Sequence, residues 1–81
     1  MHYVYLLESV REPRQIYLGR TDDLRTRFRD HNAGKSPHTD KHRPWNLVCY
    51  HAFAAERHAI DFEHYLKSGS GRAFRKRHFG I

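Results

Sequence analysis

The stretch that decides the fold is residues 2–20, HYVYLLESVREPRQIYLGR. It contains two short apolar runs, at 2–8 and 15–20, joined by a polar segment with a proline. Apolar runs of this length on either side of a turn predict an antiparallel β-hairpin. In the first run both sets of alternate residues are apolar: Tyr3, Tyr5 and Leu7 on one face, Val4 and Leu6 on the other. A strand that is apolar on both faces is expected to lie in the centre of the sheet.

The rest of the chain predicts helices around one further strand. A helix is expected from an N-cap at Thr21 to about residue 32. A polar loop at 35–45 leads into a strand at about 46–53, which is rich in valine, tyrosine and phenylalanine. A long helix over 55–67 and a short basic helix capped by Ser70 complete the chain. This order predicts an α+β domain: a small three-stranded antiparallel sheet flanked by helices.

Composition narrows the class of protein. The 81 residues suit one domain, spanning 1–81, and the single cysteine, Cys49, excludes an intrachain disulfide. No run approaches the roughly 20 apolar residues of a membrane span, and no signal sequence precedes the first strand, so we expect a cytoplasmic protein without a membrane partner. The net charge is +6, and most of the 15 basic residues are arginine. Arginine holds phosphate oxygens bidentately, so nucleic acid is the expected partner.

Two tyrosines and two polar residues on the apolar stripe of the first helix are candidate site residues. Tyr5 and Tyr17 lie on neighbouring predicted strands, where their phenols can lie side by side on one face. Arg27 and His31 continue the apolar stripe of the first helix, an unusual place for an arginine, which needs a partner when it is buried. The plainer interpretation is that the tyrosines are core aromatics and that Arg27 is a surface residue.

Glu63 is the carboxylate that borders the inner stripe of the long helix. It is a candidate to join the two phenols and the guanidinium in phosphodiester chemistry. The alternative is a surface ion pair with Lys67, four residues further along the helix.

Taken in order, these motifs resemble the GIY-YIG nuclease family, over nearly the whole chain. Tyr3-Val4-Tyr5 stands where that family has Gly-Ile-Tyr, and Tyr17-Leu18-Gly19 stands where it has Tyr-Ile-Gly. The segments at 23–28, 31–35, 43–48 and 63–74 are similar to its small, stand-alone bacterial branch. Tyr3 in place of glycine is the main departure, and it brings a larger side chain close to the site.

The resemblance implies a metal-dependent endonuclease that acts on DNA, in repair, recombination or nucleic-acid turnover. It implies that Tyr17 orients or deprotonates the attacking water beside Tyr5, that Arg27 stabilises charge on the phosphate, and that His31 positions water or contacts the phosphate. Glu63 would hold one divalent cation, Mg²⁺ or Mn²⁺.

The remaining arginines are expected to contact phosphates rather than bases, because no helix resembles a groove-reading element. These are Arg20, Arg25, Arg29, Arg72, Arg75 and Arg77. A partner protein of repair or recombination is also expected, since a nuclease without an added DNA-binding domain would bind weakly. Two alternatives stay open: a non-catalytic nucleic-acid-binding module, and a structural domain recruited by a larger repair assembly.

Overall fold

A three-stranded antiparallel sheet forms the centre of the molecule. The computed structural model covers residues 1–81 and contains β1 (His2–Ser9), β2 (Ile16–Thr21) and β3 (Trp45–Phe53), in the spatial order β2-β1-β3. The predicted hairpin and the central position of the first strand are therefore confirmed. Of the seven side chains that form the buried apolar core, four come in sequence from β1, Val4 to Leu7. This explains why both faces of that strand are apolar.

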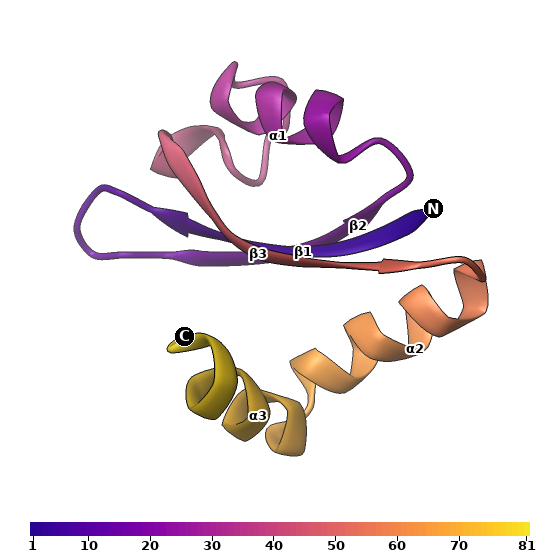
Figure 1. The fold of residues 1–81 in the computed structure, drawn as a ribbon. Helices are drawn as coiled ribbons and strands as arrows, with labels where there is room; N and C mark the ends of the chain where they lie inside the picture. Colours follow the sequence, from indigo (N-terminus) through magenta and orange to yellow (C-terminus); the bar gives the residue numbers. More distant parts are fainter.

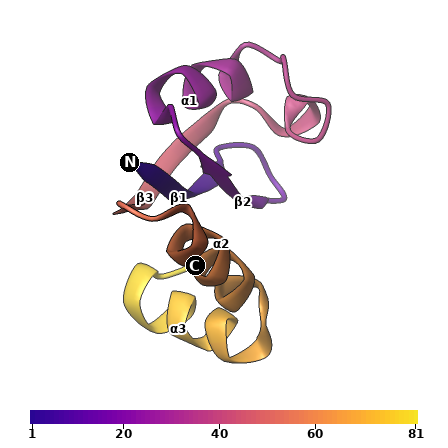
Figure 2. The same ribbon diagram turned by 90° about the vertical axis from the view of Figure 1, so that its right-hand side faces the viewer.

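Helices cover both faces of the sheet (Figure 1). The helix α1 (Leu24–Asn32) lies on one face, and α2 (Glu56–Lys67) and α3 (Gly69–Phe79) lie on the other, as the perpendicular view also shows (Figure 2). A single 3₁₀ turn at Asp40–His42 interrupts the loop that leads to β3. The expected α+β class and the element order are confirmed. None of the helices is long and apolar enough to cross a membrane.

The central strand divides the core into two clusters. On the α1 side, Tyr5 and Leu7 pack with Trp45. On the α2 side, Val4 and Leu6 pack with alanine and leucine side chains of α2. Burying each large apolar side chain contributes about 1.5–3 kcal/mol. The four consecutive residues Val4–Leu7 of β1 thus alternate between the two clusters, and the strand cannot slip by one residue without exchanging its two faces.

Two predicted helix caps were wrong by two residues. Asp23, not Thr21, caps α1, because its carboxylate accepts a hydrogen bond from the Thr26 N–H at 3.2 Å. This hydrogen bond lowers the pKa of Asp23. Thr21 instead accepts the N–H of Asp23 at 3.1 Å, which supports the turn before the helix.

The second corrected cap is Ser68, which replaces Ser70. Ser68 is the single residue between α2 and α3, and its hydroxyl donates to the Tyr65 carbonyl and accepts the Gly71 N–H at 3.1 Å. Gly71 is buried, and a Cβ there would overlap the Tyr65 backbone carbonyl. Only glycine allows the first turn of α3 to approach the end of α2 this closely.

Candidate active site

The two tyrosines, Arg27 and His31 meet on the α1 face of the sheet. Tyr5 comes from the central strand, Tyr17 from the edge strand β2, and His31 from the last turn of α1. The ring centroid of His31 lies 4.8 Å from that of Tyr17 and 5.8 Å from that of Tyr5, and the two tyrosine rings are 6.1 Å apart. Arg27, one turn before His31 on α1, is close enough to interact with both phenols. Four of the five predicted catalytic residues therefore form one cluster.

Gly19 gives the phenols their room. It pairs with Tyr5 across the β1–β2 ladder. A Cβ on Gly19 would lie 2.6 Å from the Tyr5 hydroxyl oxygen and 2.8 Å from Cε2 of Tyr17. Real Cβ atoms do not approach other atoms so closely, so glycine is required here by a close approach of side chains.

The two tyrosines differ in exposure. Tyr5 is almost completely buried, with 1% of its surface exposed, whereas Tyr17 is only partly buried. Burial, together with the neighbouring Tyr17, raises the pKa of Tyr5 to about 12, against the opposing effect of Arg27. Tyr5 therefore keeps its proton at neutral pH, and Tyr17 is the phenol that a substrate can reach.

Arg27 is charged and His31 is neutral at pH 7. Burial opposes the charge on Arg27, but hydrogen bonding and attraction to Tyr5 and Tyr17 outweigh it and raise its pKa. Burial, ahead of the charge of Arg27, lowers the pKa of His31, so the imidazole is neutral at pH 7. Tyr5 is a buried aromatic, as the plainer interpretation expects, whereas Arg27 is only partly exposed and lies beside the two phenols.

A loop residue that the sequence did not single out completes the cluster. His31 is fully buried, and its two ring nitrogens have separate partners: Nε2 lies 2.8 Å from the Tyr5 hydroxyl and Nδ1 lies 2.7 Å from Oγ1 of Thr39. Thr39 is itself buried, and its carbonyl accepts the Trp45 indole N–H at 2.9 Å. The contact between α1 and the loop is non-local, so no spacing in the sequence reveals it.

Glu63 and Arg20 lie on the opposite face of the sheet. Arg20 pairs with Val4, whose side chain belongs to the α2-side core, and its Nε lies 3.4 Å from a Glu63 carboxylate oxygen. The second oxygen of Glu63 lies 3.3 Å from Nζ of Lys67, so the predicted helical ion pair is present as well. Arg20 also reaches Glu56 at 3.5 Å. The sheet separates this ionic cluster from the phenols, and Tyr17 and Arg20 lie on opposite faces of the edge strand β2.

The residues around Glu63 fit a single-carboxylate cation site. The structure brings together no group of three or more histidine, cysteine, aspartate or glutamate side chains. Mg²⁺ is commonly held by one or two carboxylates, with water and substrate phosphates as the other ligands. Glu63 and Glu56 already hold a cation between them, the guanidinium of Arg20. Glu63 is the better buried of the two, with 15% of its side chain exposed, and is the residue that would hold a metal ion.

Comparison with known proteins agrees with this arrangement of motifs. A family model described as the GIY-YIG catalytic domain matches residues 1–77. The chain belongs to the GIY-YIG family. The UPF0213 protein of Haloquadratum walsbyi is 38% identical over 68 residues, which cover 83% of this chain and 74% of that protein. The UPF0213 protein of Bacillus pumilus is 35% identical over 68 residues, which cover 83% of this chain and 67% of that protein.

A second group of relatives is much longer. The structure-specific endonuclease subunit SLX1 of Candida dubliniensis is 38% identical over 82 residues, which cover 93% of this chain but only 27% of that protein. This chain therefore spans about a quarter of the endonuclease subunit. No solved structure matches the chain.

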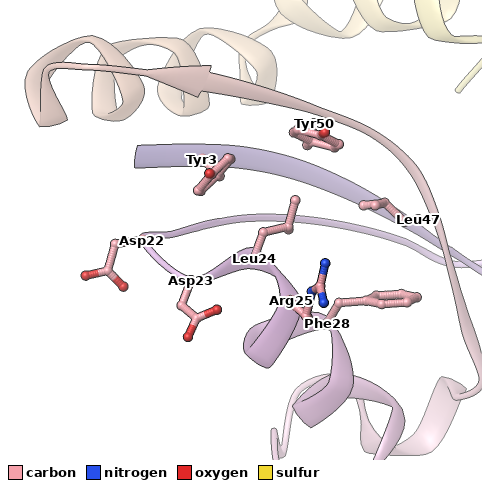
Figure 3. Close-up of a pocket in the computed structure, with 8 residues that line it drawn as sticks. All are labelled: Tyr3, Asp22, Asp23, Leu24, Arg25, Phe28, Leu47 and Tyr50. Atoms are coloured by element: carbon pink, nitrogen blue, oxygen red, sulfur yellow. The ribbon is translucent and has the colours of Figure 1, made fainter. Parts of the chain in front are cut away.

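Tyr3, where the chain departs from the GIY-YIG motif, contributes to a pocket on the α1 side of the sheet. An open cavity of about 410 Å³ lies between the first half of α1 and the sheet, with Tyr3 and Tyr50 on the sheet side and Leu24 and Phe28 on the helix side (Figure 3). The ring centroids of Tyr3 and Tyr50 are 6.0 Å apart in an edge-on arrangement. Tyr3 therefore forms part of a pocket wall, where the family's glycine would contribute no side chain.

The arginines predicted to contact phosphates lie on both sides of the sheet. Arg25 and Arg29 are exposed on α1, and Arg72 and Arg77 are exposed on α3. Arg75 differs from them: it is half-buried and donates to the backbone carbonyls of Leu66 at 3.4 Å and Ile81 at 3.2 Å. Its hydrogen bonds tie the end of α2 to the chain terminus.

Proposed function

We propose that this GIY-YIG domain is an endonuclease that hydrolyses phosphodiester bonds in DNA. The observation that carries the proposal is the meeting of two phenols, a guanidinium and a neutral imidazole at one buried-to-exposed boundary. A core packed only for stability has no need of a half-buried arginine beside two tyrosine hydroxyls. The family match over residues 1–77 and the similarity to endonuclease subunits support the same activity.

Each residue has a distinct role in the proposed reaction. Tyr17 is the accessible phenol: it orients the attacking water and, as it takes a proton from that water, gives up its own phenolic proton to the groups behind it. The water oxygen bonds to phosphorus, the bond from phosphorus to the 3′ oxygen breaks, and the 3′ oxygen is protonated by solvent. Arg27, which keeps its charge, stabilises the negative charge that develops on the phosphate. Tyr5 and His31 lie behind Tyr17, hydrogen-bonded to each other at 2.8 Å, where they can take up the proton that Tyr17 gives up.

Glu63 is the proposed ligand of a divalent cation, Mg²⁺ or Mn²⁺. Such an ion, when bound, polarises the phosphate and stabilises the leaving oxygen. In its absence, Arg20 and Lys67 neutralise the Glu63 carboxylate. When a metal ion pairs with Glu63, Arg20 is released and can bind a phosphate of the substrate. Arg20 thus neutralises Glu63 before the metal binds and contacts DNA afterwards.

The DNA-binding role rests on the charge of the chain and on its exposed arginines. The net charge of +6 and the exposed guanidiniums of Arg25, Arg29, Arg72 and Arg77 provide non-specific attraction to the phosphate backbone. Arg20 and Arg75 complete the set of proposed phosphate contacts, although both are already engaged in contacts within the protein. We place the protein in the cytoplasm, in repair or recombination, together with a partner protein that adds affinity.

The principal alternative is a non-catalytic module that binds nucleic acid. The observation that favours it is that both oxygens of Glu63 are engaged by cations of the protein itself. Labelled branched, nicked, single-stranded and duplex DNA, each incubated with Mg²⁺ or Mn²⁺, separate the two functions. A binding module and an endonuclease would both bind these substrates, but only an endonuclease would cut them. Binding to these substrates without any cleavage would contradict the proposed function.

Tyr17→Phe is the sharpest test of the proposed site. It retains the ring and removes only the hydroxyl that handles the water, so cleavage should fall by roughly 10²–10⁴-fold while thermal stability stays nearly constant. Tyr65→Phe is the matched control, because Tyr65 lies on α2, with 41% of its surface exposed. If Tyr17→Phe cut DNA as well as Tyr65→Phe, Tyr17 would be only a packing residue.

A further inference from the structure

A chain of hydrogen bonds runs from the catalytic cluster into the loop before β3. It links the Tyr5 hydroxyl to Nε2 of His31 at 2.8 Å, Nδ1 of His31 to Oγ1 of Thr39 at 2.7 Å, and Oγ1 of Thr39 to the Ser36 carbonyl at 3.4 Å. Tyr5, His31 and Thr39 are each at most 1% exposed, so the chain is closed to solvent.

The direction of this chain follows from what each group can donate. A neutral imidazole carries one N–H, so its two hydrogen bonds must run the same way. At the Tyr5 end, Arg27 is donor-only and can interact only with the phenol oxygen, which favours a Tyr5 proton directed to Nε2 of His31.

The opposite end of the chain agrees with this direction. When the Thr39 hydroxyl donates its one proton to the Ser36 carbonyl, 3.4 Å away, its oxygen is left to accept. Nδ1 of His31 must then carry the imidazole proton and donate it to Thr39. Both ends are consistent with the same tautomer, with Nδ1 protonated and Nε2 free.

Thr39 itself is held rigidly in place. Its carbonyl accepts the Trp45 indole N–H at 2.9 Å, and its N–H donates to the Ser36 carbonyl at 3.2 Å. Trp45 is in turn fixed by Asn32, whose side-chain amide exchanges two hydrogen bonds with the Trp45 backbone. Asn32 directly follows His31 in the chain. The segment that carries His31 is therefore bonded to Trp45 through Asn32, and Trp45 is bonded to Thr39 through its indole N–H.

We propose that Thr39 is a positioning residue that fixes His31 as the Nδ1-protonated tautomer, so that Nε2 can accept the proton of Tyr5. The proposal rests on the endonuclease function above. When Tyr17 takes a proton from water it passes its own to Tyr5, the Tyr5 O–H bond breaks, and an Nε2–H bond forms on His31. The resulting imidazolium keeps its Nδ1–H on Thr39, while Arg27 remains beside the phenols. The proton lost by the attacking water is thereby stored in a buried group.

The test uses the whole chain with ¹⁵N-labelled histidine at pH 8, where His31 is neutral. His31 is assigned by the signals that disappear in His31→Gln. The wild type should show a protonated Nδ1 and an unprotonated Nε2. Thr39→Ser keeps the hydroxyl and should preserve this pattern, whereas Thr39→Val keeps the shape and should shift the population toward the other tautomer. A wild-type spectrum with Nε2 protonated, or no difference between the serine and valine variants, would overturn the proposal.

Kinetics supply an independent readout. Thr39→Val should lower kcat by roughly 10–100-fold with little change in KM for DNA, as happens when a partner that orients a histidine is lost, and Thr39→Ser should restore most of the rate. Thr26→Val is the matched control, a threonine on the exposed face of the helix that carries His31. Equal loss of kcat in the serine and valine variants would contradict the role of the hydroxyl.

Two further experiments distinguish a failure of this proposal from a failure of the endonuclease function on which it rests. If Thr39→Val fails to fold, Trp45→Phe retains an aromatic ring and removes the N–H that holds the Thr39 carbonyl; it should weaken the tautomer preference, and a preference equal to that of the wild type would count against the proposal. If the wild type cuts no DNA but shows the predicted tautomer, the endonuclease function is wrong and the assignment of Thr39 to His31 stands.

Discussion

Replacing Gly19 with alanine tests the geometry of the candidate active site directly. The new Cβ would lie 2.6 and 2.7 Å from Oη and Cζ of Tyr5 and 2.8 Å from Cε2 of Tyr17. Ordinary contacts begin at 3.4 Å, so the rings must move by about 0.6–0.8 Å. Tyr5 is almost completely buried and its ring is stiff, so it cannot turn aside into solvent. A displacement of that size is enough to disrupt its 2.8 Å hydrogen bond to His31.

Two terms set the magnitude of the effect on stability. Overpacking a well-packed core costs about 1–3 kcal/mol, and alanine recovers about 0.5–1 kcal/mol relative to glycine because the unfolded chain is less flexible. We expect Gly19→Ala to lower the free energy of unfolding by about 1–2 kcal/mol and the Tm by roughly 5–15 °C. Cleavage per folded molecule should fall by at least about tenfold, because the reacting phenols are displaced.

The assay combines urea denaturation with cleavage of a labelled substrate. Gly69→Ala is the matched control, since a Cβ on Gly69 would meet no atom within 4 Å, and its stability and activity should stay at wild-type levels. A Gly19→Ala variant as stable and as active as Gly69→Ala would refute the close approach of the two phenols at Gly19.

The remaining predictions concern the metal, pH and DNA binding. Glu63→Gln should abolish Mg²⁺-dependent cleavage and leave DNA binding and the fold intact; cutting at the wild-type rate would show that Glu63 holds no essential ion. Burial, ahead of a neighbouring guanidinium, lowers the pKa of His31 from 6.5, so its contribution to stability is present above pH 6.5 and is lost as the pH falls below that value. Urea denaturation between pH 8 and 5 should show this loss, and a His31→Gln variant should show less of it. Replacing Arg72 and Arg77 with alanine should reduce the slope of log K against log salt by roughly two units, about one for each lost phosphate contact, without loss of stability. Arg75→Ala should lower the Tm instead, because it removes hydrogen bonds to two backbone carbonyls.

The sequence was sufficient for the elements of the fold and for most of the cluster, but the reason differs between residues. The central position of β1 followed from apolar residues on both faces, a pattern that only one place in the sheet accommodates. Tyr5 and Tyr17 met because neighbouring strands of a hairpin bring their side chains together. The N-cap of α1 was misplaced because Thr21 and Asp23 are both good caps, and only the path of the backbone decides between them.

Two features of the site lay beyond sequence patterns because they depend on long-range packing. Thr39 is eight residues from His31, in a loop with no periodicity, and only the anchoring of that loop by Trp45 places its hydroxyl against the imidazole. Helical periodicity indicated that Glu63 borders the inner stripe of α2, but it could not say which face of the sheet α2 covers. That choice placed Glu63 opposite the tyrosines rather than among them.

The position of Glu63 limits where a substrate can lie if the proposed function is correct. Tyr17 and Arg20 are three residues apart on β2, so their side chains point to opposite faces, roughly 10 Å apart along the strand. β1 and β3 cover only one side of β2, and its other side is a free edge. A phosphate bound over the middle of either face would reach only one of the two groups. A phosphodiester that crosses the free edge of β2 reaches Arg27 and Tyr17 from one face and Arg20 and Glu63 from the other. The edge strand thus brings the two halves of the site together, and Gly19, between Tyr17 and Arg20, leaves the space that the Tyr5 and Tyr17 phenols occupy beside that crossing.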